Sequence, residues 1–290
     1  MIRVLITGAT GYLASLIMKT NQQQFEFIPL TRKQIDFSHV ESVYSSLQNY
    51  QADIIVHTAA MTQTANCEQN PQLSHRINVE SVSEIVRYCN DYQVRLIVFS
   101  SEQVVNGKTE GSFFDEETNC QSVTRYGQDK IEADEIIRNQ CNDYVLLRLS
   151  WMFGLDYPDV TASPNLVKNV MNALLYQQQT QFTVNEYRGL TYAQLLADNF
   201  DKVTRLEKGL YNFSATNHLN TYESARLIAS YFVESETEIN RYILRNESKY
   251  SDRPRDYRLS NQKLSKNGIQ LFDLKQNIEL CLKEFGWFKK

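Results

Sequence analysis

The sequence predicts an α/β protein built on a doubly wound parallel sheet, and three observations support this. Short β-branched runs alternate with segments of helical spacing through the first half, which is typical of βαβ units. Several of these runs are apolar throughout, as in strands that are buried on both faces. A glycine-containing turn separates the first run from the first helical segment. A chain of 290 residues is long enough to bury such a core.

The expected elements of the first half follow one another at short intervals. Strands are predicted at residues 2–6, 25–30, 54–57, 94–100 and 144–149. Helices are predicted at residues 12–19, 40–49, 71–92 and 126–140. Pro71 falls in the first turn of the longest of these helices, where proline is well tolerated.

Composition and charge exclude several classes of protein. The net charge is −4 and is spread along the chain, which argues against nucleic-acid or membrane-surface binding. No apolar run reaches the roughly eighteen residues of a membrane span. The sequence starts with a strand rather than a signal peptide, so we expect a cytoplasmic protein. Five scattered cysteines and four histidines lack disulfide or metal-site spacing, so we expect no metal.

A dinucleotide-binding turn is predicted at residues 7–15, which read TGATGYLAS. The turn follows a strand and opens a helix, which is the context that this fingerprint requires. Gly8 permits the tight turn, and Gly11 lets the backbone approach a pyrophosphate at the helix N-terminus. Ala14 is tolerated at the third position, and no GK[ST] follows, so this is not an ATP-binding P-loop. A plain strand–turn–helix corner is the alternative to this Rossmann-type interpretation.

The end of the second predicted strand bears on the choice of cofactor. NAD-binding folds commonly place an acid there to hold the ribose 2′-hydroxyl. Residues 29–33 read PLTRK and contain no acid, whereas Arg32 and Lys33 suit a 2′-phosphate. We therefore predict NADPH, with NADH as the other candidate, and a solvated basic turn remains the alternative. Asp36 comes slightly later and is expected near the adenine.

The chain is expected to divide into two regions. Residues 1–150 are expected to form a Rossmann domain that binds NAD(P). Beyond residue 151 the alternation loosens, and residues 151–290 are expected to form mainly a smaller substrate-binding lobe over the carboxyl edge of the sheet, with some segments returning to the sheet. Helices are predicted there at residues 165–177, 192–206, 221–233 and 274–285, and a strand at residues 211–214.

A candidate reaction centre lies at the carboxyl end of the strand at residues 94–100. Ser101 follows that strand, where ligands of such sheets bind. Tyr126 and Lys130 in YGQDK are four residues apart, so they share one helical face. A neighbouring ammonium is expected to lower the pKa of the tyrosine from its usual value near 10. An exposed pair of helix residues is the alternative.

Taken together, these segments resemble an extended short-chain dehydrogenase/reductase. HTAA at residues 57–60 and SSEQVVNG at residues 100–107 add to the glycine loop and YGQDK. More narrowly, SSEQVVNG, RLSWMFG at residues 148–154 and RPRDYRL at residues 253–259 resemble segments of the dTDP-4-dehydrorhamnose reductase (RmlD-like) family. The resemblance runs essentially from end to end of the chain.

The resemblance implies a reaction. NADPH or NADH would reduce the 4-keto carbon of a nucleotide-linked deoxysugar, as in dTDP-rhamnose biosynthesis. Tyr126 would protonate the developing alkoxide, Ser101 would orient it, and Lys130 would tune Tyr126 and hold the cofactor ribose. The residues expected to bind the cofactor are Gly8, Thr10, Gly11, Tyr12, Leu13, Arg32, Asp36, Phe37, Ala59, Ala60, Ser100, Tyr126 and Lys130.

The substrate is expected to meet four further residues. Trp151 would face the sugar and Arg253 would meet the diphosphate, because arginine suits bidentate phosphate contacts. Glu102 and Gln103 would border the sugar. Core packing is the alternative for Trp151, and a surface position is the alternative for Arg253. Besides the nucleotide sugar, a homodimer partner is compatible with the sequence.

Three departures from the family pattern border the expected sugar site. Gln103 stands where the family usually has tyrosine, Asn106 replaces an aspartate, and residues 61–68 match only in part. Two other functions are compatible with the fold. One is a regulatory or binding subunit, because the regulatory subunit of methionine adenosyltransferase resembles this family. The other is a sugar-nucleotide epimerase.

Overall fold

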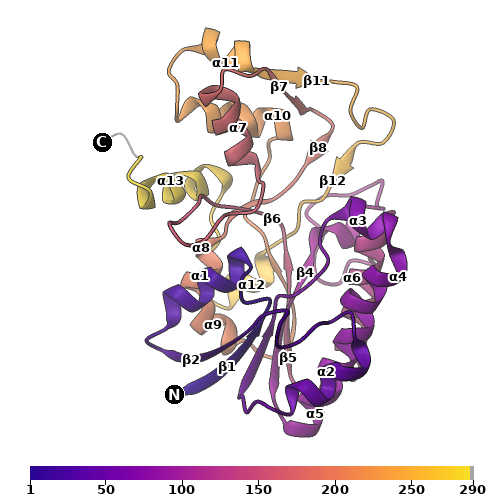
Figure 1. Cartoon of the computed structure of the whole chain (residues 1–290). Helices are drawn as coiled ribbons and strands as arrows, with labels where there is room; N and C mark the ends of the chain where they lie inside the picture. The colour runs from indigo at the N-terminus through magenta and orange to yellow at the C-terminus, as the bar shows by residue number, and fades with distance from the viewer. Residues whose placement is uncertain (288–290) are drawn as a thin grey trace.

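The computed structural model describes residues 1–287 and is organised around one six-stranded parallel sheet (Figure 1). The strand order is β10-β5-β4-β3-β1-β2, so the winding direction reverses between β1 and β3. The expected doubly wound α/β fold is confirmed. The six strands are β1 (Ile2–Thr7), β2 (Phe25–Leu30), β3 (Ile54–His57), β4 (Arg95–Ser101), β5 (Tyr144–Leu149) and β10 (Gly209–Phe213).

The apolar character of the strands follows from their burial on both faces. In β1, Val4 and Ile6 face one core cluster and Leu5 faces the other, and none of the three is exposed to solvent. This is the two-residue alternation of a pleated strand with a core on each side. The helices of one face are α1 (Tyr12–Asn21), α8 (Gln194–Asp198) and α9 (Phe200–Thr204). Those of the other face are α2 (Val40–Leu47), α5 (Ser81–Tyr92) and α6 (Arg125–Gln140).

The predicted helix at residues 71–92 is helical throughout but is not regular. It consists of α4 (Pro71–His75), a π-helical turn η1 (Arg76–Glu80) and α5. The wider turn directs the buried side chain of Asn78 toward the loop after β3, where its amide binds both backbone groups of Met61. A π turn has no signature in apolar periodicity, and such turns are frequent at functional sites.

The predicted helix at residues 192–206 is wrong at its start and at its centre. Tyr192 belongs to strand β9 (Leu190–Tyr192), and its backbone N–H donates to Asn277 Oδ1 at 2.7 Å. The remaining residues form α8 and α9, which meet at Asn199. The side-chain amide of Asn199 donates to the carbonyl of Leu195 at 2.9 Å, a local bond that competes with regular helix.

The rest of the second half forms a lobe beyond the carboxyl edge of the sheet (Figure 1). Its strands pair two by two and in parallel: β6 (Trp151–Phe153) with β9, β7 (Thr180–Thr183) with β11 (Ile243–Asn246), and β8 (Glu186–Tyr187) with β12 (Arg255–Asp256). Its helices are α7 (Leu166–Leu175), α10 (Thr221–Ser230), α11 (Glu236–Tyr242) and α13 (Leu274–Glu284).

The chain also returns from the lobe to the sheet. Strand β10 pairs with β5 at the sheet edge, and α12 (Gln262–Lys266) packs beside it. Two short elements flank the candidate reaction centre: α3 (Thr64–Gln69), which packs on α6, and the 3₁₀ turn η2 (Glu102–Val105) after β4. Within residues 1–287, no helix is both long and apolar enough to cross a membrane.

A side chain at position 8 should destabilise the fold. Gly8 has a φ of +62°, and an added Cβ would lie 2.8 Å from Thr58 Oγ1 and 2.9 Å from the nitrogen of Ala59. Gly8→Ala therefore combines backbone strain with a steric clash, and we expect a loss of about 2–4 kcal/mol. Urea denaturation measures this loss.

Gly268→Ala is the matched control for Gly8→Ala. Gly268 has a φ of +79°, but an added Cβ there meets no described atom within 4 Å. Only the backbone strain remains, so we expect a loss of about 1 kcal/mol. Equal losses for the two variants would contradict the close packing of the glycine loop against the end of β3.

Candidate active site

A cavity of about 800 Å³ opens at the carboxyl edge of the sheet, where the winding direction reverses. Open α/β sheets bind their ligands at this position. The end of β1, the loop after β3 and the end of β4 all contribute to its lining. Every residue expected to bind the cofactor and all three expected catalytic residues lie in that lining. The structure therefore brings together groups from across the first 130 residues of the chain.

The glycine loop forms a cradle at one end of the cavity. The N–H of Gly11 donates to the carbonyl of Gly8 at 2.8 Å, which closes the tight turn, and Gly8 packs against Thr58 and Ala59. Within the described chain, no side chain caps the N-terminus of α1 at Gly11. Its first N–H groups therefore point outward unpaired, which suits an anion such as a pyrophosphate.

The end of β2 contributes Arg32, Asp36 and Phe37 to the lining. The side chain of Arg32 is 75% exposed, and its Nε lies 3.3 Å from Asp36 Oδ2. Hydrogen bonds from Ser38 are the main reason that the pKa of Asp36 is lowered, and Arg32 adds to them. Lys33, the second cation of the predicted 2′-phosphate site, does not line the cavity.

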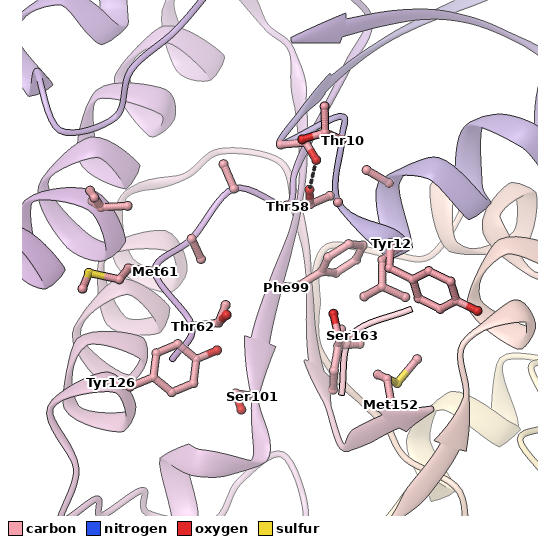
Figure 2. A pocket seen from close by; sticks show the side chains of 18 of the residues that line it. Thr10, Tyr12, Thr58, Met61, Thr62, Phe99, Ser101, Tyr126, Met152 and Ser163 are labelled. Carbon is pink, nitrogen blue, oxygen red and sulfur yellow. Dashed lines mark hydrogen bonds between the residues drawn. The ribbon is translucent and has the colours of Figure 1, made fainter. Parts of the chain in front are cut away.

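The opposite end of the cavity holds Ser101 and Tyr126 (Figure 2). Lys130 of the same helix as Tyr126 also lines the cavity. Tyr126 and Ser101 lie near each other there, beside Thr62 of the loop after β3, and across the cavity from Met152. Lys130 Nζ lies 5.9 Å from the centroid of the Tyr126 ring and donates to the carbonyl of Phe99 at 2.9 Å.

Ser101 is oriented by the turn that follows it. Its Oγ accepts the N–H of Gln103 at 3.2 Å, at the start of η2. One oxygen lone pair is thereby occupied, so the hydroxyl proton is directed elsewhere. A hydrogen bond from Ser101 to Tyr126 lowers the pKa of that phenol. Ser101 is thus placed to donate to an oxygen atom beside Tyr126.

The electrostatics of Tyr126 differ from the sequence expectation. Lys130 was expected to lower the pKa of Tyr126, but burial raises that pKa well above its usual value, and the Ser101 hydrogen bond opposes burial only in part. Burial also lowers the pKa of Lys130. A low-dielectric site disfavours the charged form of both groups. The phenol is therefore protonated at neutral pH and available as a proton donor.

The four residues expected to bind the substrate lie outside the lining of the cavity. Glu102 is 1% exposed, and its carboxylate accepts the guanidinium of Arg188 and the N–H of Trp151. Burial raises the pKa of Glu102 to about 7, although Arg188 acts in the opposite direction. The side chain of Gln103 accepts a hydrogen bond from Asn106, whose backbone carbonyl accepts Arg253.

Arg188 is a residue that the sequence analysis missed. Its guanidinium lies 4.4 Å from the Trp151 ring and 5.6 Å from the Tyr257 ring, besides its pair with Glu102. Trp151, which was expected to face the sugar, is half-buried and stacks on the guanidinium of Arg188. A lone arginine far from every recognisable motif gave no signal for this cluster.

Two further walls of the cavity were also missed. In the loop after β3, Asn78 fixes Met61 by hydrogen bonds of 2.8 and 3.0 Å, and this places Thr62 in the lining. The segment after β6 contributes Ser163 and Asn165 from the second half of the chain. Asparagine is a preferred residue at the N-terminus of a helix, and this preference could have identified Asn165. Its Oδ1 accepts the N–H of Lys168 at 3.0 Å at the start of α7.

The acidic, histidine and cysteine side chains of residues 1–287 form no group that could hold a metal ion. The lining consists instead mainly of backbone, hydroxyl and apolar groups, with the buried ammonium of Lys130 and the charged pair Arg32 and Asp36 of the loop after β2. These groups suit an elongated organic ligand that carries an anion in its middle.

The chain belongs to the family described as RmlD substrate binding domain, whose sequence model matches residues 2–286. The sequence-based resemblance to this family is confirmed. The fold is likewise that of solved members: a dTDP-4-dehydrorhamnose reductase from Bacillus anthracis, solved in complex with NADP, superposes with a TM-score of 0.84. The two chains are 22% identical, and the superposition covers 98% of each.

Curated relatives carry related but different names. A probable low-salt glycan biosynthesis reductase from Haloferax volcanii is 27% identical over an alignment that includes 58% of this chain. The alignment includes 60% of that relative, so this chain matches less than two thirds of its length. A dTDP-4-dehydrorhamnose reductase from Salmonella typhimurium is 26% identical, over 82% of this chain and 80% of that protein. The methionine adenosyltransferase 2 subunit beta of Bos taurus is 25% identical, over 92% of this chain and 83% of that protein.

A histidine bridge beside the site should make stability depend on pH. His75 Nδ1 lies 3.1 Å from Glu80 and Nε2 lies 3.1 Å from Glu132 on α6. Burial disfavours the imidazolium, but the hydrogen bonds to Glu132 and Glu80 outweigh it and raise the pKa of His75. The resulting stabilisation is complete below the unfolded value of about 6.5 and is lost as pH rises through the folded pKa.

We therefore expect His75→Gln to lower the urea midpoint below pH ~6.5 and to leave it nearly unchanged at alkaline pH. The effect should be below about 1 kcal/mol, as for other partly exposed ion pairs. The double variant Glu80→Gln, Glu132→Gln should remove the same pH-dependent step. A loss of stability that is equal at acidic and alkaline pH would contradict the role of the imidazolium.

Proposed function

We propose that this protein reduces the 4-keto group of a nucleotide-linked deoxysugar with a reduced nicotinamide dinucleotide, NADPH or NADH. The observation that supports this most is a single cavity with an uncapped glycine loop at one end and Ser101, Tyr126 and Lys130 at the other. Membership of the RmlD family agrees with it. A role in dTDP-rhamnose formation in the cytoplasm belongs to the same proposal and rests on the sequence resemblance.

The residues of the chain have separable roles in the proposed reaction. The cradle at Gly8 and Gly11 would hold the pyrophosphate of the cofactor, and Lys130 would bind the ribose near the reaction centre. When bound, a reduced nicotinamide would supply the hydride for the 4-keto carbon. Ser101 orients the carbonyl oxygen by donating a hydrogen bond. Tyr126 transfers its proton to that oxygen as negative charge develops, and Lys130 stabilises the phenolate that remains.

The surroundings of Glu102 support a reductase over a dehydratase. Related 4,6-dehydratases carry an acid pair after the strand-end serine or threonine, because they move protons at two sugar carbons. Here the second position is Gln103, whose amide neither takes up nor releases a proton near neutral pH. The carboxylate of Glu102 is occupied by Arg188 and the N–H of Trp151. A reductase needs only one proton donor, which Tyr126 supplies.

A regulatory subunit is the second candidate function. It is favoured by the resemblance to the methionine adenosyltransferase 2 subunit beta, which extends over 92% of this chain. The buried Tyr126 and Lys130 and the oriented Ser101 favour chemistry instead, because a binding subunit has no need of a proton donor in its cavity. Failure to turn over any ketosugar, together with stable binding to a partner enzyme, would favour the regulatory function.

Replacement of Tyr126 tests the proposed proton donor. Tyr126→Phe should keep its affinity for NADPH and lose about 10²–10⁴-fold in turnover, because only the hydroxyl is removed. NADPH oxidation with a panel of nucleotide-4-ketosugars measures turnover, and a fluorescence titration measures binding. Tyr176→Phe, at a side chain that is 70% exposed, is the matched control and should behave as wild type. Near-normal turnover of Tyr126→Phe would reject the assignment.

Replacement of Arg32 tests the preference for NADPH. Arg32→Ala should weaken NADPH binding about 10–100-fold and leave NADH binding nearly unchanged, because a hydrogen bond to a charged group contributes about 1.5–3 kcal/mol. Lys33→Ala removes the neighbouring cation, which does not line the cavity, and should affect NADPH less. Equal affinities of the wild type for NADPH and NADH would contradict the 2′-phosphate site.

A further inference from the structure

A buried carboxylate lies directly behind the reaction centre, and no step of the proposed reaction uses it. Asp134 is 3% exposed and lies one helical turn after Lys130 and two turns after Tyr126, so all three share one face of α6. Burial of a carboxylate is costly unless it is paired and hydrogen-bonded. The partners of Asp134 therefore indicate what it does.

Strand pairing between β4 and β5 brings two donors to Asp134. Ser100 and Arg148 are register partners in neighbouring strands, so their side chains emerge on the same face of the sheet. Ser100 Oγ donates to Asp134 Oδ2 at 2.9 Å, and Arg148 Nε donates to the same oxygen at 3.2 Å. Lys130 binds the carbonyl of Phe99, the residue before Ser100.

These contacts of Asp134 affect two residues that line the cavity, Ser100 and Lys130. Ser100 lines the cavity, and because its proton is committed to Asp134, its lone pairs are left to accept a hydrogen bond from a bound ligand. The ammonium of Lys130 is buried and is disfavoured by desolvation, and the negative charge of Asp134 is the main influence that opposes this. The same charge disfavours the phenolate of Tyr126.

We propose that Asp134 is a positioning residue for the reaction centre: its buried carboxylate orients the hydroxyl of Ser100 and keeps Lys130 charged behind Tyr126. The proposal rests on the proposed function, because it assigns a role within that same site. Asp134 touches neither the cavity nor a reacting atom and acts only through Ser100 and Lys130.

Other ionisable groups face this cluster from every element packed around it. Burial raises the pKa of Asp134, and Arg148, Ser100 and Lys130 act in the opposite direction. The other ionisable groups that interact with Lys130, Asp134 or Arg148 are His57 of β3, Cys67 of α3, Cys120 of the loop before α6, Tyr126 and Asp129 of α6, and Tyr144 of β5. Asp129 is held by Ser74 and Arg125 on the other side of α6. Asp134 remains the carboxylate bonded to the strand that carries Ser100 and Ser101.

Asp134→Asn tests the proposal, because it keeps the size and an acceptor oxygen but removes the charge. Without that charge, Lys130 loses its proton at lower pH and Tyr126 ionises more easily. Both effects move the alkaline limb of activity in the same direction. We expect the alkaline limbs of NADPH binding and of turnover to move to lower pH by about one unit, the order of shift that a neighbouring charge causes.

Two variants serve as controls. Glu135→Gln removes the same charge from the neighbouring, exposed position of α6 and should leave both limbs in place. Asp134→Glu retains the charge and should restore the limbs toward the wild-type pH. Asp134→Asn leaves the buried guanidinium of Arg148 without its ion-pair partner and could prevent folding. In that case the double variant Asp134→Asn, Arg148→Gln removes both charges. The limb should still move, because Asp134 and not Arg148 is the group that acts on Lys130.

The outcomes separate the two proposals. A fall in turnover by the same factor at every pH, with the alkaline limbs of binding and turnover unchanged, would overturn the proposed role. Asp134 would then contribute only to the stability of the fold. NADPH binding whose limb moves, without turnover of any ketosugar, would support Asp134 and reject the proposed reaction. Turnover without movement of either limb would support the reaction and reject Asp134.

Discussion

The parallel pairing of β1, β3 and β4 is the constraint on which the site depends. Parallel strands end at the same edge of a sheet, so the glycine loop, the loop at residues 58–62 and Ser100–Ser101 meet although they are far apart in sequence. Burial of the sheet on both faces fixes its register, because a slip of one residue would turn the apolar set of each strand to the wrong core. The position of the cavity is therefore a consequence of the fold, which brings these loops together.

Burial at this edge also sets the chemistry. Burial keeps Tyr126 protonated and disfavours the ammonium form of Lys130. Groups on the side of Lys130 away from the cavity therefore have to stabilise its charge. The negative charge of Asp134 on α6 and the carbonyl of Phe99 on β4 supply this support. On the other side, the pairing of Glu102 with Arg188 withdraws a carboxylate that a dehydratase would use. In the proposed reaction, Tyr126 is therefore the group that gives its proton to the substrate.

Local patterns predicted the fold and identified residues that the structure brings into one cavity, because a glycine turn, an i,i+4 pair and apolar strands are each formed by neighbouring residues. The substrate side depends on contacts between distant residues, such as Glu102 with Arg188 and Asn78 with Met61, which no local pattern marks. The paired strands of the lobe contain only two to four residues, too few to show a period. Burial of Tyr126 likewise depends on the whole fold, so its raised pKa could not be read from YGQDK.

The central claim, that the site reduces its substrate, is tested most directly by counting the cofactor consumed. The purified protein is incubated with NADPH and nucleotide-4-ketosugars, and the fall in nicotinamide absorbance is compared with the sugar product measured by mass spectrometry. A reductase consumes one equivalent of NADPH for each sugar reduced. Product that accumulates over many turnovers while the nicotinamide absorbance stays constant would contradict the claim, because an epimerase or dehydratase regenerates its cofactor in each cycle.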